Sequence, residues 1–255
     1  MLETFTVELF KLQAQETLVF KPSVVRLTAL TAISLLSGCG GGSGSPPAAV
    51  APPAQIQATT FPIQAALQNY YSTSQSYSVS GTAVDANGTK SDLVLTYTHA
   101  VGEDASFEGI AAKTVQTKII AKRNNAPAPE TTEKLFLRLN PFSYVGRTGA
   151  SGYGVYSSQG VIPVNIKVGD SGSLGTVTGY VDSTKKTPVG QSTETWTLEA
   201  DPGSSTTAFW CVTNQASNKT SPDKSIECLK ITTTGAVVGH RLNGQVNGFT
   251  IALSG

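Results

Sequence analysis

The chain has 255 residues, and its 18 Lys and Arg side chains nearly balance its 17 Asp and Glu side chains, so the formal net charge is +1. The charged residues are interspersed and form no basic run. Binding of nucleic acid and adsorption to anionic lipid both depend on clustered Lys and Arg, so the composition argues against these two functions.

The first predicted element is a secretory signal peptide over residues 1–38. An uncharged apolar run, residues 27–36, follows Lys21 and Arg26 and is followed by small residues. This order is typical of a signal peptide. The run is also too short to span a bilayer, which takes about twenty apolar residues.

The first seventeen residues are atypical of such a leader, because Glu3, Glu8 and Glu16 place acidic charge where basic residues are expected. Translation that begins near Leu18 or Val19 would explain them, with residues 1–17 arising from a misplaced start codon. A long N-terminal region of the signal peptide is the alternative, and the sequence leaves both open.

The apolar run leads into Leu36-Ser37-Gly38-Cys39, which resembles the lipobox of bacterial lipoproteins. The resemblance implies that Cys39 is lipidated, that residues 1–38 are removed and that the new terminus is acylated. It also implies the cell envelope, and Gly40 rather than Asp after the cysteine implies the outer membrane. Residues 39–60 then form a Gly-, Ser- and Pro-rich tether. The membrane is the expected partner, through the lipid anchor.

Residues 61–255 are predicted to form a single β domain. Residues 61–71 are the only plausible helix: Pro62 suits its first position, and Ile63 and Leu67 share one apolar face. From residue 77 onward apolar residues alternate with Thr, Ser and charged residues, and turn signals separate the runs. The pattern predicts an all-β antiparallel meander of about 9–11 strands, as a curved sheet, a barrel or a sandwich.

Cys211 and Cys228 remain of the three cysteines once Cys39 takes the lipid. Both lie in predicted strands, and a hairpin centred between Lys219 and Thr220 places them directly opposite each other. Opposed residues are within disulfide reach, and an envelope compartment allows the bond to persist. We therefore predict a structural disulfide.

Candidate catalytic motifs are weak. Residues 169–172, Gly-Asp-Ser-Gly, resemble the nucleophile loop of trypsin-like serine proteases, and His99 precedes them. However, Ser173 replaces a glycine, and no acidic residue in between matches the family's orienting aspartate, so a turn is the preferred interpretation. His99 and His240 are too few for a metal site. We expect no catalytic residue, metal or cofactor.

The segment 140–156 is unusual in composition, because Phe142, Tyr144, Tyr153 and Tyr156 alternate with Gly and Ser. Such residues are typical of recognition loops that contact a ligand or partner. A loop that folds back over the core is the alternative. The sequence does not decide between them.

These observations predict a lipid-anchored envelope protein that acts as a non-enzymatic binding or scaffold module. Its expected partners are another envelope protein or a hydrophobic ligand. A large apolar concavity would favour a carrier, and a filled core would favour a scaffold. The alternative is a hydrolase with an unrecognised site, built on His99, His240 or a carboxylate pair.

Overall fold

The computed structural model describes residues 59–255, except 128–129, 151, 218–222 and 247. The predicted signal peptide, Cys39 and residues 40–58 of the predicted tether lie outside the described residues, whereas Thr60, at the end of that tether, begins β1. Within the described part, no helix combines the length and the apolar character needed to cross a membrane. The elements in chain order are β1 (Thr60–Phe61), α2 (Ile63–Tyr71), β2 (Gln75–Val84), β3 (Lys90–Phe107), β4 (Ile110–Arg123), β5 (Ala126–Pro127), β6 (Thr131–Leu139), β7 (Phe142–Gly149), β8 (Gly152–Tyr156), β9 (Ile166–Lys167), β10 (Ser171–Tyr180), β11 (Pro188–Asp201), β12 (Ser204–Ala216), β13 (Lys224–Thr232), β14 (Val237–Val246) and β15 (Phe249–Ser254).

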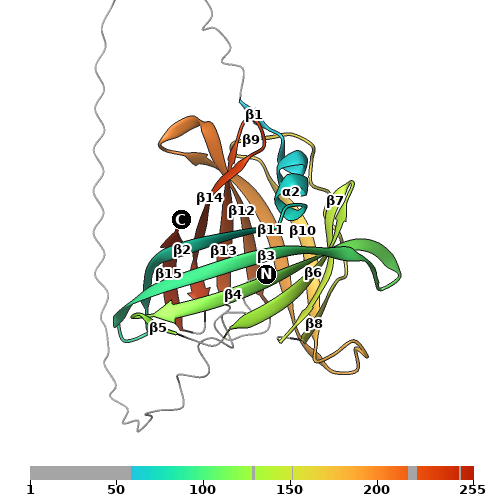
Figure 1. Cartoon of the computed structure of the whole chain (residues 1–255), viewed down its shortest axis with the longest axis horizontal. Coiled ribbons are helices and arrows are strands. Elements are labelled where there is room, and N and C mark those ends of the chain that lie inside the picture. The colour runs from blue at the N-terminus through green and yellow to red at the C-terminus, as the bar shows by residue number, and fades with distance from the viewer. Residues whose placement is uncertain (1–58, 128–129, 151, 218–222, 247) are drawn as a thin grey trace, which may run out of the picture. The chain divides into compact units, whose positions relative to one another are not determined.

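The strands form a closed antiparallel barrel (Figure 1). The main sheet has 13 strands, in which β3 pairs with both β2 and β4, and the ring closes where the last strand, β15, pairs with β2. Short β5 lies beside β4 outside the ring, so the ring itself has twelve strands. All neighbouring strands of this sheet pair antiparallel, and β15 returns to β2, while β1 and β9 pair with each other in a separate two-stranded sheet. The expected all-β antiparallel meander with one short helix is confirmed, and of the three shapes left open it is the barrel.

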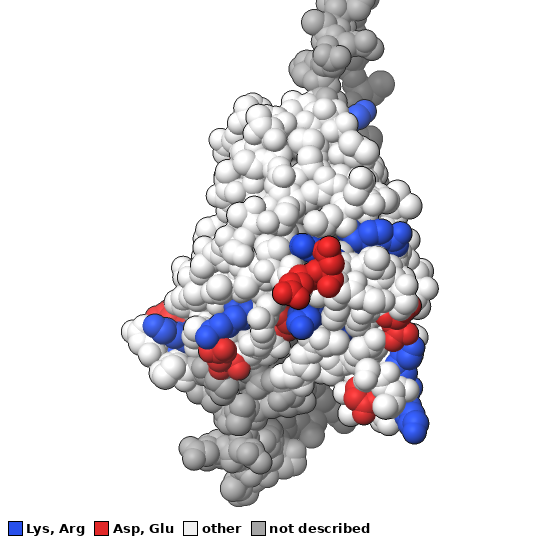
Figure 2. Space-filling view, turned by 45° about the vertical axis from the view of Figure 1, so that its right-hand side comes forward, with Lys and Arg blue, Asp and Glu red and all other residues white. Residues whose placement is uncertain are grey.

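Alternation along each strand separates the inside of the barrel from the outside. On β3, Leu93, Leu95, Tyr97 and His99 are buried, whereas the residues between them are exposed or half-buried. The outer positions are rich in Thr, Ser and charged residues, and the face in Figure 2 shows both signs of charge interspersed. Every second side chain of a strand therefore points into the barrel, and these side chains fill its interior.

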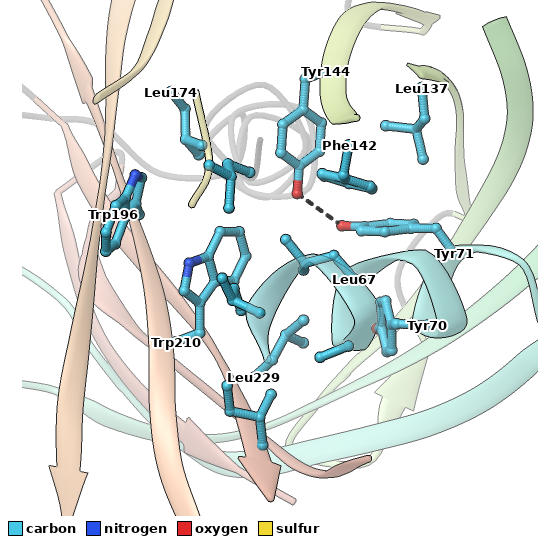
Figure 3. Close-up of a cluster of buried hydrophobic side chains, with 14 of the residues drawn as sticks. Leu67, Tyr70, Tyr71, Leu137, Phe142, Tyr144, Leu174, Trp196, Trp210 and Leu229 are labelled. Atoms are coloured by element: carbon cyan, nitrogen blue, oxygen red, sulfur yellow. Dashed lines mark hydrogen bonds between the residues drawn. The ribbon is translucent and has the colours of Figure 1, made fainter. Parts of the chain in front are cut away.

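Helix α2 lies inside one end of the barrel. Its buried residues belong to one core cluster with inward-facing residues of β4, β6, β7, β8 and β10–β13, so it contacts walls from around the ring (Figure 3). The amide of Ala66 donates to the carbonyl of Pro62 at 3.0 Å, which closes the first turn. The expected start of this helix at residue 61 was two residues early. Its buried residues are Ile63, Ala66, Leu67, Tyr70 and Tyr71.

The predicted disulfide is confirmed. Cys211 of β12 pairs in register with Cys228 of β13, and their Cα atoms are 4.0 Å apart. Both cysteines alternate with inward-facing residues and therefore face outward. Nη2 of Arg241 lies 3.3 Å from each sulfur, so the arginine covers the bond. The bond links two neighbouring strands of the barrel wall.

Replacing both cysteines with alanine, C211A together with C228A, is expected to lower the free energy of unfolding by about 3 kcal/mol, because the loop between them spans a sequence separation of 17. Urea unfolding of wild type and variant measures the difference. Wild type in excess reductant should match the variant. Equal midpoints for oxidised wild type and variant would contradict a stabilising role.

Candidate ligand-binding site inside the barrel

The four aromatic residues of segment 140–156 do not form a recognition loop. The segment forms β7 and β8, and Phe142, Tyr144 and Tyr156 are buried and face the interior. Only Tyr153 faces outward, where its hydroxyl donates to Glu108 at 2.6 Å. Phe142 and Tyr144 therefore pack in the core, and their rings both contact the ring of Tyr71 on α2 (Figure 3).

Tyr156 leads from this aromatic core to a buried carboxylate. Its hydroxyl donates to Oε2 of Glu194 at 2.5 Å, and Nδ2 of Asn214 donates to Oε1 of the same side chain at 3.0 Å. Glu194 on β11 has 0% exposed surface, and Asn214, its register partner on β12, has 1%. These bonds hold Glu194 in the water-excluded interior.

A second carboxylate lies beyond Arg147 of β7. Nη1 of Arg147 is 4.0 Å from Oε1 of Glu194, and its Nε is 3.7 Å from Oε1 of Glu133 on β6. Arg147 therefore lies between two buried carboxylates. Burial raises the pKa of Glu133 to about 7, although the charge of Arg147 acts in the opposite direction.

Glu227 of β13 adds a third carboxylate. It is in phase with buried Ser225 and Leu229 and so points inward, yet it is only half-buried. Burial raises its pKa, and the charge of Glu194 raises it further. Arg147 forms ion pairs with two of these carboxylates, Glu133 and Glu194. We call Glu133, Arg147, Glu194, Asn214 and Glu227 the polar cluster.

The remaining arc of the barrel presents an apolar surface to the interior. It comprises contiguous strands β14, β15, β2, β3 and β4. It meets the polar cluster at both margins: Leu242 pairs with Glu227, and Ile119 lies one inward position from Thr117, the partner of Glu133. We call this surface the apolar wall; its buried members are Val79, Ala83, Leu93, Leu95, Tyr97, Ile119, Ala121, Leu242, Val246, Ile251 and Leu253.

The two histidines lie in one aromatic group with Tyr70 and Tyr77. The ring centroid of Tyr70 is 5.2 Å from that of His99 and 5.7 Å from that of His240, and Tyr77 stacks on His240. Burial lowers the pKa of each histidine to about 4. Both imidazoles are therefore neutral at pH 7, and this grouping was not readable from the sequence.

The other sequence motifs are turns. Asp170 accepts from the amide of Lys167 through Oδ2, and Ser171 is exposed at the start of β10, whereas His99 is buried on β3. These residues do not form a nucleophile and base pair. A similar turn joins β2 to β3, where Asp85 accepts hydrogen bonds from the amides of Asn87 and Thr89.

Sequence reasoning did not single out the polar cluster. The sequence did contain a signal for it, because each glutamate lies two residues from apolar residues of the same strand face. Glu133 is in phase with Leu135 and Leu137, and Glu194 is in phase with Trp196 and Leu198. A carboxylate in the apolar phase of a strand faces the core. No family model, curated protein or solved structure matches this chain.

His99→Phe should reduce the acid sensitivity of the fold. The folded-state pKa of His99, about 4, lies below its ordinary 6.5, so unfolding takes up a proton and wild type loses stability as pH falls from 6.5 to 4. The contribution of His99 is on the order of 2–3 kcal/mol. Phe keeps the ring contacts without the titration.

Urea unfolding of both proteins at pH 7.5 and pH 4.5 tests this. The stability of the variant relative to wild type should rise at the lower pH. Because Glu133 titrates in both proteins, its opposite trend cancels in the comparison. A difference that is independent of pH would contradict the buried neutral state of His99.

Proposed function

We propose that this chain is a lipid-anchored envelope protein whose barrel binds a small ligand in its interior. The lipobox-like sequence ending at Cys39 and the following tether support the anchor. Non-enzymatic binding is the function that the interior favours most. The observation that carries it is the polar cluster, which places three carboxylates and one guanidinium on inward-facing positions of a closed barrel.

A purely structural barrel has no use for this arrangement. An unpaired buried charge is strongly destabilising, and an unsatisfied buried polar group costs about 1–3 kcal/mol. Apolar side chains of similar volume would fill the same positions, as they do on the apolar wall. Departures from this rule are expected where a protein binds or reacts with something. The cluster therefore favours a binding module over a scaffold.

The hydrolase alternative has one supporting observation, the raised pKa of Glu133 beside a second buried carboxylate. Against it, Glu133 and Glu194 have only 2% and 0% exposed surface. A polymeric substrate could not reach them without opening the barrel. A small molecule held inside needs no such access during its residence.

The ligand is expected to copurify with the protein. Native mass spectrometry of the mature protein from its own cells should show a mass above that of the lipidated chain, and acid denaturation should release the difference as a small molecule. Ligand-free masses alone, from several growth conditions, would contradict binding.

Cys39→Ala is expected to abolish the anchor, because no thioether can form at that position. The wild type should sediment with membranes. Most of the variant should carry no lipid and should stay in the supernatant. The C211A/C228A variant serves as the control, since it lacks two cysteines and should keep the lipid. Fractionation with mass analysis of the first mature residue measures the outcome, and lipid on the C39A protein would refute the assignment.

A further inference from the structure

We propose that the end of the barrel that contains α2 faces the lipid bilayer, and that three exposed valines at this end contact the bilayer surface. Val161, Val164 and Val168 make up this valine surface, and we call the end that contains α2 the helix end. The inference rests on the lipid anchor of the proposed function and adds the face that the anchored domain turns toward the membrane.

The valine surface is a local concentration of exposed apolar side chains. Among the described residues, six large apolar side chains are exposed, and three of them lie within residues 161–168. Val161, Val164 and Val168 are 84%, 63% and 49% exposed. Single exposed apolar residues are ordinary, whereas a group of them on one segment is typical of a surface that contacts a partner or a membrane.

The segment that carries these valines is held firmly on the barrel. Ile162 and Ile166, which lie between the valines, are only 1% and 2% exposed and belong to the core around α2. Nε2 of Gln64 on α2 donates to the carbonyl of Ile162 at 2.6 Å, and the amide of Gly169 donates to the carbonyl of Leu198 at 2.9 Å. The backbone is therefore fixed by its buried residues, and it presents the valines to the outside.

The predicted tether enters the domain beside the valine surface. Thr60, its last residue, pairs with Lys167 of β9, and Phe61 pairs with Ile166. Both short strands lie at the helix end (Figure 1). The chain from Cys39 to Thr60 spans at most about 70 Å when fully extended. A lipid on Cys39 would therefore attach the domain to the bilayer at this end and keep the local concentration of the valine surface on the order of 1 mM.

The distribution of charge also distinguishes the helix end from the opposite end. Four turns at the helix end contain no charged residue: 72–74, 140–141, 202–203 and 233–236. The turn 181–187, at the opposite end, contains Asp182, Lys185 and Lys186. Glu108, at the tip of the β3–β4 hairpin, is directed away from the helix end, because it forms an ion pair with Lys185. In Figure 2 the charged side chains gather on the lower part of the molecule, and the upper part is nearly free of them. Moving charges out of water is costly, so the helix end is the one suited to lipid.

The charged residues near the valine surface are compatible with this contact. Lys167 is exposed beside Val168, and a lysine can extend its ammonium to lipid phosphates while its hydrocarbon stem stays among apolar atoms. Oδ2 of Asp170 accepts from the amide of Lys167 at 2.8 Å, and Asp201 forms an ion pair with Lys230 at 2.8 Å. The contact therefore depends on apolar area and on the anchor, and it needs no basic patch.

Lipids with brominated acyl chains test the contact, because bromine quenches Trp fluorescence at short range. Val164→Trp places a reporter in the valine surface. Val189→Trp is the matched control, since Val189 is 57% exposed and lies on β11 near the opposite end. The lipidated mature chain is reconstituted in phosphatidylcholine vesicles with and without brominated lipid. The signal of the two native Trp residues, which are buried, is subtracted by use of wild type. Quenching of the added fluorescence should be at least about twofold stronger for Val164→Trp than for Val189→Trp.

A second pair of variants tests whether the valines themselves make the contact. Val161→Ser and Val168→Ser, introduced together into the Val164→Trp chain, should reduce its quenching by about half, because the apolar area offered to the bilayer falls. Val181→Ser and Val238→Ser, introduced together into the same chain, are the control and should leave the quenching unchanged, since both valines are exposed elsewhere on the barrel. Near-UV circular dichroism confirms that each variant is folded.

The outcomes separate this inference from the proposed function. If the chain floats with the vesicles but the two Trp variants are quenched equally or not at all, the valine surface does not face the bilayer, and the anchor stays in place. If neither is quenched and native mass spectrometry shows a dimer, a second copy covers the valines instead. A mature chain that carries no lipid and does not float contradicts the anchor, and the inference fails with it.

Discussion

The pairing of β15 with β2 is the constraint on which the rest of the structure depends. Its register runs from Ser80 opposite Ser254 to Val84 opposite Thr250. Without it the meander would be an open sheet with two exposed edges, and its inward side chains would face water. Helix α2 directly precedes β2, and its buried residues pack against inward-facing residues from strands around the closed ring. The charge chemistry of the interior exists only because the barrel is closed.

The two parts of the closed interior differ chemically. Around α2, aromatic rings from β7, β8, β11 and β12 fill the space, and Tyr71 and Tyr144 bring their hydroxyls within 3.2 Å of each other. Away from the helix, one arc is apolar and the facing arc contains Glu133, Glu194 and Glu227. The helix-bearing end therefore contains the aromatic core, whereas the rest of the interior has one apolar side and one side with carboxylates.

The sequence predicted what depends on local pattern. Alternation identified the strands, Pro62 and the spacing of Ile63 and Leu67 identified the helix, and the hairpin length placed Cys211 opposite Cys228. Closure was not predictable, because a meander of this length can end as an open sheet, a sandwich or a barrel. The polar cluster was also missed, since it combines β6, β7, β11, β12 and β13, whose proximity follows only from the ring. The four aromatic residues were assigned to a loop because their glycines suggested turns, although those residues lie in two strands.

Arg147 connects two carboxylates that lie on different strands of the closed ring. Nε of Arg147 lies 3.7 Å from Glu133 and its Nη1 lies 4.0 Å from Glu194, so one guanidinium forms an ion pair with each carboxylate. Glu194 has Tyr156 and Asn214 as additional donors, whereas Oε1 of Glu133 has no hydrogen bond among the described residues. Burial is the main cause that raises the pKa of Glu133 to about 7. The charge of Arg147 acts against this effect, so the ionisation of Glu133 depends on how closely the guanidinium approaches it.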